Sequence, residues 1–162
     1  AGIAEEHFFS AFLRNKIGAR MHHVGNRSQG SRLLMACLPG EFHELGVLLF
    51  ALSAMSRGYR ILFLGADLPL NQIPPVVDSS HANAVILSGS SDISLAAIKD
   101  GIEALTQQIN IPLYIGGSIC ESFDDQIFSR AIRLGNDYQS ALSILEQQIP
   151  AHQNNAQMPN EW

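Results

Sequence analysis

From residue 32 onward, short apolar runs alternate along the chain with longer segments in which apolar and polar residues mix. The runs are typical of strands buried on both faces, and we expect strands at 33–38, 59–64, 84–87, 113–115 and 132–134. Helices are expected between and after them, at 47–57, 70–80, 93–109, 122–130 and 137–148. The last of these begins with Asp137, an aspartate suited to capping free amides, and stops before Pro150.

Five strands that alternate with five helices predict an α/β fold with a parallel sheet covered on both faces. The natural arrangement is a flavodoxin-like, Rossmann-type, doubly wound five-stranded sheet. Because crossovers between parallel strands are right-handed, the loops that follow the first, third and fourth strands should gather at one edge of the sheet. Any ligand site is expected at that edge.

A separate helix is expected before the sheet, over residues 4–23. Its apolar residues recur at steps of three and four: Phe8, Phe9, Phe12, Leu13, Ile17 and Met21. The glycine- and serine-rich stretch that follows has no apolar period, which is typical of a linker. The chain therefore divides into a helix (1–24), a linker (25–31), the main domain (32–150) and a tail rich in Asn, Gln and Pro (151–162).

Composition and charge limit the classes of protein to which this chain can belong. With 162 residues, 46% of them hydrophobic and 15% charged, the chain has the composition of a globular protein with one core. A net charge of −5 argues against a grip on a nucleic-acid backbone by this chain itself. It has no apolar stretch of membrane-spanning length and no secretory signal, so we expect a soluble cytoplasmic protein. Cys37 and Cys120 lie in apolar runs and are expected to be buried, reduced thiols.

The loop after the first strand carries the clearest candidate chemistry. Glu41 precedes His43 by two residues and could orient its imidazole, while Gly46 follows three residues later and leaves room for a bulky group. Neutral imidazole is a common ligand for first-row transition metals. Glu44 is expected to be a solvated acid that complements the dipole of the following helix.

Two further loops should face this histidine loop across the sheet edge. One holds Ser88 and Ser90 after the third strand, and the other holds Gly116 and Gly117 after the fourth. Bare backbones on both sides leave an open slot for a long ligand segment. The chain has neither a GxGxxG nor a GxxxxGK[ST] phosphate motif, and Ser88 stands where a phosphorelay receiver domain needs an aspartate.

These residues carry a resemblance. The pattern Glu41-x-His43-x-x-Gly46, with Ser88 and Gly116-Gly117, resembles the cobalamin-binding Rossmann-type domain, whose motifs are DxHxxG, SxL and GG. The resemblance implies that His43 binds cobalt from below through Nε2, that the cofactor's own dimethylbenzimidazole base is displaced, and that its nucleotide tail enters the slot. Glu41 replaces the aspartate and keeps a carboxylate that can accept a hydrogen bond from Nδ1–H. Ser90 replaces the leucine of SxL.

The first helix narrows the resemblance to one group of cobalamin-binding proteins. Residues 4–12 are similar to the last helix of the four-helix cap in light-responsive, adenosylcobalamin-dependent MerR-type repressors, whose cap motif is Trp, nine residues and then Glu-His. Glu6 and His7 match the second half of that motif and would face the upper side of the corrin. The resemblance implies a non-enzymatic sensor whose intact protein forms homo-oligomers in the dark, contacts DNA through a domain absent from this chain, and is released when light breaks the cobalt–carbon bond.

Other interpretations stay open. The lower-domain motifs also occur in corrinoid proteins that shuttle methyl groups and in the cobalamin half of mutases, and a third hypothesis is a ligand-free module for dimerisation. His22 and His23 are adjacent on a helix and so point apart, which disfavours a metal pair. The face with Phe8, Phe9 and Phe12 should pack on the domain or on another copy of the chain.

Overall fold

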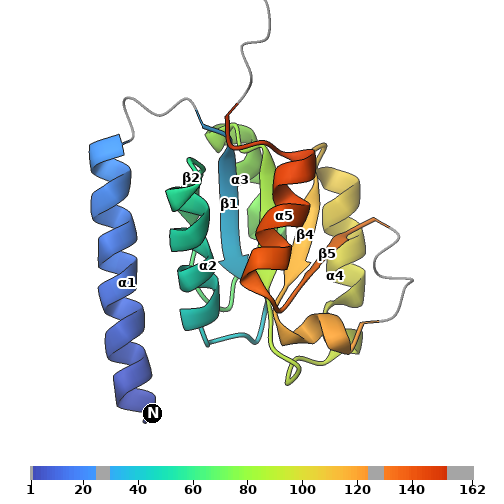
Figure 1. Cartoon of the computed structure of the whole chain (residues 1–162). Coiled ribbons are helices and arrows are strands. Elements are labelled where there is room, and N and C mark those ends of the chain that lie inside the picture. The colour runs from blue at the N-terminus through green and yellow to red at the C-terminus, as the bar shows by residue number, and fades with distance from the viewer. Residues whose placement is uncertain (1, 25–29, 124–129, 153–162) are drawn as a thin grey trace, which may run out of the picture.

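The computed structural model describes residues 2–24, 30–123 and 130–152. Five parallel strands form one sheet in the order β2-β1-β3-β4-β5 (Figure 1). Their bounds are β1 (Arg32–Cys37), β2 (Arg60–Phe63), β3 (Ala84–Ser88), β4 (Leu113–Gly116) and β5 (Ile132–Gly135). The doubly wound, flavodoxin-like order expected from the apolar pattern is therefore confirmed.

Helices cover both faces of the sheet. α2 (Leu45–Ser56) and α5 (Tyr138–Gln148) lie on one face, and α3 (Ile73–Ser80) and α4 (Leu95–Gln108) lie on the other (Figure 1). Two short 3₁₀ turns, η1 (Leu70–Gln72) and η2 (Ser118–Glu121), precede α3 and follow β4. α1 (Ile3–Val24) stands outside these layers, beside α2 (Figure 1).

β1 shows why the apolar runs are continuous. Leu34 and Ala36 enter the core under α3 and α4, whereas Leu33, Met35 and Cys37 enter the core under α2 and α5. All five are fully buried. Because both faces of a central parallel strand are covered, successive residues point into two different cores and none can be polar.

Several element bounds differ from the sequence-based expectation. The expected helix 70–80 begins as η1, and α3 starts with prolines in its first turn, where a missing N–H costs nothing. Most of the expected helix 122–130 and of the linker 25–31 lies outside the described residues. The tail expected from residue 151 is ordered at its start, since the carbonyl of the buried Ala151 accepts the Ser31 backbone N–H at 2.9 Å.

α1 uses a different side from the one its phenylalanines suggest. Ile17 is buried against the domain and Leu13 packs beside it. Phe8, Phe9 and Phe12 are instead 69%, 55% and 48% exposed, so of the two expected partners of this face the chain's own domain is excluded, and packing on another copy stays a prediction. The face that meets α2 is the stripe that also carries Ser10, and the phenylalanines lie on another side of the helix. No helix in the described part of the chain is both long and apolar enough to cross a bilayer.

Candidate functional site

The loop after β1 is fixed by a reciprocal pair of hydrogen bonds to the loop after β2. The backbone N–H of Gly40 donates to Asp67 Oδ1 at 2.8 Å, and the backbone N–H of Asp67 donates to the Glu41 carbonyl at 2.9 Å. Gly40 has a φ of +83°, which favours glycine. This turn directs Glu41 into the protein interior, and the residue is only 3% exposed.

The Glu41 carboxylate holds His43 through both backbone and side chain. Glu41 Oε1 lies 2.9 Å from His43 Nδ1 and also accepts the His43 backbone N–H at 2.8 Å. Since the carboxylate accepts at Nδ1, it favours the tautomer with the proton there and leaves the lone pair on Nε2. The His43 side chain is 67% exposed, so the imidazole is oriented on one side and open on the other.

The second carboxylate oxygen of Glu41 reaches the loop after β3. Oε2 accepts the backbone N–H of Ser90 at 2.6 Å. Burial alone raises the pKa of Glu41, but hydrogen bonds from His43 and Ser90 outweigh burial and hold this pKa below its ordinary value of 4.5. Glu41 is therefore a carboxylate at neutral pH, with both of its oxygens engaged.

Ser90 does not line the cavity described below, so its contact with a ligand stays a prediction. Its backbone N–H and its side chain both hydrogen-bond to Glu41. The backbone contact survives the change from the leucine of the SxL motif, because any residue with a backbone N–H can make it.

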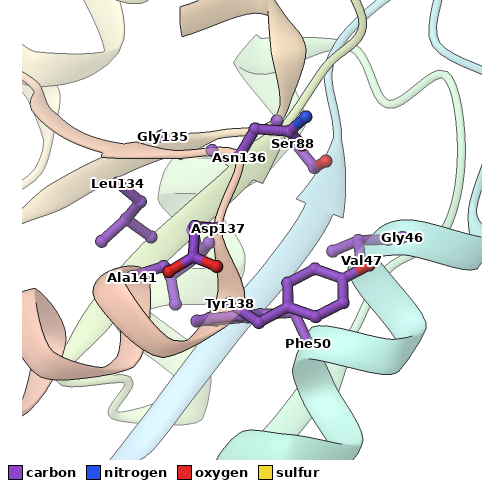
Figure 2. A pocket seen from close by; sticks show the side chains of 13 residues that line it. Gly46, Val47, Phe50, Ser88, Leu134, Gly135, Asn136, Asp137, Tyr138 and Ala141 are labelled. Carbon is purple, nitrogen blue, oxygen red and sulfur yellow. The ribbon is translucent and has the colours of Figure 1, made fainter.

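A cavity next to this loop collects four of the residues expected to form a slot. Gly46 from α2, Ser88 from β3, and Gly116 and Gly117 after β4 all line it (Figure 2). Its empty volume is about 440 Å³, part of it open to solvent. The sequence-based slot at the carboxyl edge of the sheet is therefore present as a cavity, and it extends between α2 and α5.

The cavity has a wall that the sequence reasoning did not include. This wall comes from β3, from β5 and its connection to α5, and from the inner faces of α2 and α5. Its residues are Val47, Phe50, Ile86, Leu134, Gly135, Asn136, Asp137, Tyr138 and Ala141. Figure 2 shows Tyr138 reaching from the start of α5 toward Phe50 and Gly46 on α2. The sequence did hold a signal for this wall, namely the loop after the fifth strand. In the strand order β2-β1-β3-β4-β5 this loop also lies at the carboxyl edge of the sheet.

The glycines at the site have different reasons to be glycine. Gly117 has a φ of +96°, and a Cβ there would stand 2.3 Å from the Gly89 carbonyl oxygen, so the fold requires glycine. A Cβ on Gly46 would meet the Tyr138 hydroxyl at 3.6 Å, and one on Gly116 would meet the Gly135 carbonyl oxygen at 3.6 Å. Both are ordinary contacts. The fold does not need these two glycines, whose lack of a side chain keeps the cavity open.

The structure corrects the expectation that Glu44 is a solvated acid. Its side chain is 8% exposed and pairs with Arg14 of α1, whose side chain is 55% exposed. It is therefore not a solvated first-turn acid, because α1 covers it and supplies a guanidinium partner. Beside this pair lies a second, more open cavity between α1 and the end of β2, with an empty volume of about 980 Å³ that includes solvent.

Glu6 and His7 lie in the first turns of α1, which project beyond the carboxyl edge of the sheet (Figure 1). Glu6 is half-buried and His7 is exposed. Neither lines either of the two cavities. The structure thus brings them to the same end of the molecule as His43 without joining them to the slot.

Among the described residues no group of three or more His, Cys, Asp and Glu side chains could hold a metal ion. A lone, oriented imidazole suits a metal whose other ligands arrive with a cofactor. The arrangement is thus able to offer one nitrogen ligand next to a slot for an attached group.

The chain is similar in sequence to known proteins over most of its length. No family model matches the chain. It is 24% identical over 149 residues to the HTH-type transcriptional repressor CarA of Myxococcus xanthus, covering 90% of this chain and 51% of that protein. It is 28% identical over 124 residues to the repressor CarH of the same organism, covering 74% of this chain and 40% of that protein. Methionine synthase of Mycobacterium leprae is 22% identical over 136 residues, covering 79% of this chain and 11% of the enzyme. The chain thus spans about half or less of these relatives.

Solved structures match over most of the chain. A cobalamin-binding protein from Desulfitobacterium hafniense aligns with a TM-score of 0.62 at 20% identity, covering 92% of this chain and 72% of that one. The methanol:cobalamin methyltransferase complex of Methanosarcina barkeri aligns with a TM-score of 0.63 at 14% identity, covering 93% and 60%. This chain is therefore similar in sequence to two transcriptional repressors, and its five-stranded parallel sheet with helices on both faces has the fold of the cobalamin-binding Rossmann-like domains.

Proposed function

We propose that this chain binds a cobalamin, with His43 as the lower axial ligand of the cobalt and with Gly46, Ser88, Gly116 and Gly117 around the nucleotide tail. One observation carries the proposal. The buried Glu41 holds His43 at Nδ1 at 2.9 Å, and the exposed imidazole stands beside a cavity that contains all four slot residues. A ligand with a metal and a long side arm fits this combination.

The residues present fit a corrinoid in three respects. A corrin ring supplies four equatorial nitrogens, so one imidazole from the protein is sufficient, in keeping with the lone His43. The carboxylate of Glu41 accepts from the far ring nitrogen, as partners of metal-bound histidines do. Ser88 and the glycine backbones at the slot offer polar groups without filling the space.

We further propose that the chain is the sensing part of a transcriptional regulator of the MerR type. Two of the proteins similar in sequence are transcriptional repressors, and the net charge of −5 suits a part that leaves DNA binding to another domain. Adenosylcobalamin supplies a cobalt–carbon bond that light breaks. α1 offers Glu6 and His7 to the upper side, and homo-oligomers of the intact cytoplasmic protein would form in the dark.

The test is a spectrum with a histidine variant. Adenosylcobalamin is added in the dark, the absorption spectrum is recorded for histidine-ligated, base-off cobalt, the sample is illuminated, and oligomer size is followed. His43→Ala should lose the ligated spectrum. His81→Asn is the matched control, because His81 ends α3 at the opposite edge of the sheet in a left-handed conformation that asparagine tolerates. Identical spectra for His43→Ala and the native chain would overturn the lower-ligand proposal.

A second candidate is a corrinoid-carrying component of an enzyme, either a methyltransferase or a mutase. It is favoured by the methyltransferase complex and by a monomethylamine corrinoid protein of Methanosarcina barkeri, which aligns with a TM-score of 0.56 at 18% identity and covers 85% of this chain and 68% of that one. Illumination separates the two candidates. A regulator changes its oligomeric state in light, whereas an enzyme component keeps it; a methyltransferase component would in addition exchange methyl groups with a methylated donor. Failure to bind any corrinoid would instead support the hypothesis of a dimerisation module.

A further inference from the structure

We propose that Tyr138 forms an aromatic wall of the slot and selects corrinoids that carry a nucleotide tail with an aromatic base. This inference rests on the proposed function and names a residue that neither the motif pattern nor the loops after β1, β3 and β4 contain. Its evidence is the position of one ring inside the cavity.

The start of α5 fixes the backbone of Tyr138. Asp137 caps the helix, accepting the backbone N–H of Ser140 at 2.9 Å and the Ser140 hydroxyl at 2.7 Å. Tyr138 is the first residue of the helix, so the capped turn sets where its side chain begins. The ring then spans from α5 to α2 across the cavity (Figure 2).

The Tyr138 ring contacts α2 and also lines the cavity. Its centroid lies 6.3 Å from that of Phe50 with the planes inclined at 51°, and its hydroxyl lies 3.6 Å from the position a Cβ would take on Gly46. The remaining walls include the apolar side chains of Ile86 and Leu134 from the sheet. A flat aromatic base would therefore have a ring beside it and an apolar floor below it.

The other two tyrosines of the chain differ from Tyr138 in burial and in hydrogen bonding. Tyr59 and Tyr114 are 3% and 0% exposed, and their hydroxyls donate to the Ile149 carbonyl and to Gln148 Oε1. Tyr138 is 41% exposed, and its hydroxyl bonds to none of the described residues. No described residue thus fixes the Tyr138 hydroxyl, and part of the ring stays exposed, which fits a side chain that contacts a ligand.

The experiment compares two corrinoids that differ in the tail. Dissociation constants are measured in the dark for adenosylcobalamin and for adenosylcobinamide, which lacks the nucleotide tail. We expect Tyr138→Ala to bind adenosylcobalamin about tenfold more weakly, the size of one aromatic contact, and to bind adenosylcobinamide as the native chain does. Tyr138→Phe keeps the ring and should bind both within about twofold of native. The melting temperature of each cofactor-free variant is recorded as a readout independent of the ligand.

Tyr138→Leu keeps an apolar side chain without the ring, and it replaces Tyr138→Ala if the alanine variant fails to fold. Equal weakening for both corrinoids, unchanged binding of adenosylcobalamin, or tighter binding of it would each overturn the inference. A native chain that binds neither corrinoid would overturn the proposed function itself. His43→Ala should weaken the binding of both corrinoids, whereas Tyr138→Ala should weaken the binding of adenosylcobalamin alone. A failure of the proposed function and a failure of the tyrosine wall can therefore be told apart.

Discussion

Glu41 and Ser90, 49 positions apart in the sequence, are joined by a 2.6 Å hydrogen bond from the Ser90 backbone N–H to Glu41 Oε2. The other carboxylate oxygen holds the His43 imidazole at 2.9 Å. The histidine is therefore positioned by the loop after β3 as well as by its own loop.

Glu41→Gln should destabilise the fold and weaken corrinoid binding together. An amide offers one acceptor oxygen where the carboxylate uses two, so one of the N–H groups of His43 or Ser90 loses its partner. We expect a loss of about 1–3 kcal/mol in the free energy of unfolding, measured in urea. Affinity for adenosylcobalamin should fall about 10–100-fold, as for other partners of metal-bound histidines. Glu121→Gln, at the exposed last residue of η2, is the control. Native stability and affinity in Glu41→Gln would contradict the orienting role.

Stability should fall with acid in a way that depends on Glu41. Its pKa is lower in the folded chain than its ordinary value of 4.5, so the folded state binds this proton less readily than the unfolded state. The resulting stabilisation is fully present above about pH 4.5 and is lost as the pH falls through the folded value. Urea unfolding between pH 3 and 7 should show a shallower acid loss for Glu41→Gln than for the native chain. Parallel curves would exclude Glu41 as a contributor.

Cys37 and Cys120 should not react with a thiol reagent in the native state. Burial, followed by the nearby charges of Glu44 and Glu41, raises the pKa of Cys37 from its ordinary 9.0 to about 12, and burial also raises the pKa of Cys120. Both thiols therefore stay protonated and covered at neutral pH. We expect no rapid reaction with a disulfide reagent at pH 8 and complete reaction of both in urea. Ser79→Cys, at an exposed position, provides a thiol that should react at once.

Two alanine substitutions should separate a glycine that the fold requires from a glycine that ligand binding requires. Gly117→Ala puts a Cβ at a positive φ and 2.3 Å from a carbonyl oxygen, so we expect at least about 2 kcal/mol of lost stability. Gly46→Ala adds a methyl group in ordinary contact at the start of α2, and unfolding should change by at most about 1 kcal/mol. Its effect should appear in binding, because the methyl group enters the slot. Chemical unfolding and adenosylcobalamin titration of both variants check this. A large loss of stability in Gly46→Ala with normal binding would reverse the assignment.

The sequence supports the fold better than it supports contacts between distant segments. Runs such as Leu33 to Cys37 point to a covered parallel strand, since each residue must be apolar whichever face it takes. The slot residues could be grouped because parallel strands end at one edge. Tyr138 and Glu44 could not be interpreted in this way, because the role of each depends on a partner far away in the sequence. Phe50 and Gly46 face Tyr138 from α2, and Arg14 covers Glu44 from α1.

Arg14 and Glu44 connect α1 to the residue next to His43. Glu44 is 8% exposed and would be a buried carboxylate without its partner if Arg14 were removed. Because Arg14 is 55% exposed, water screens the pair, and we expect its coupling energy in a double-mutant cycle to be about 1 kcal/mol or less. The local effect should be larger than the global one, since α1 meets the domain mainly at α2.

Arg14→Ala should therefore loosen α1 more than it destabilises the sheet. Hydrogen exchange is the measurement, and amides of α1 should exchange faster in the variant while those of β1 and β3 keep their protection. Arg20→Ala, at an exposed position of the same helix, removes an equal charge away from the pair and should leave α1 unchanged. The charge swap Arg14→Glu with Glu44→Arg should recover part of the protection. If α1 exchanges alike in the native chain and in Arg14→Ala, packing around Ile17 alone holds the helix, and Glu44 does not transmit the position of the histidine loop to it.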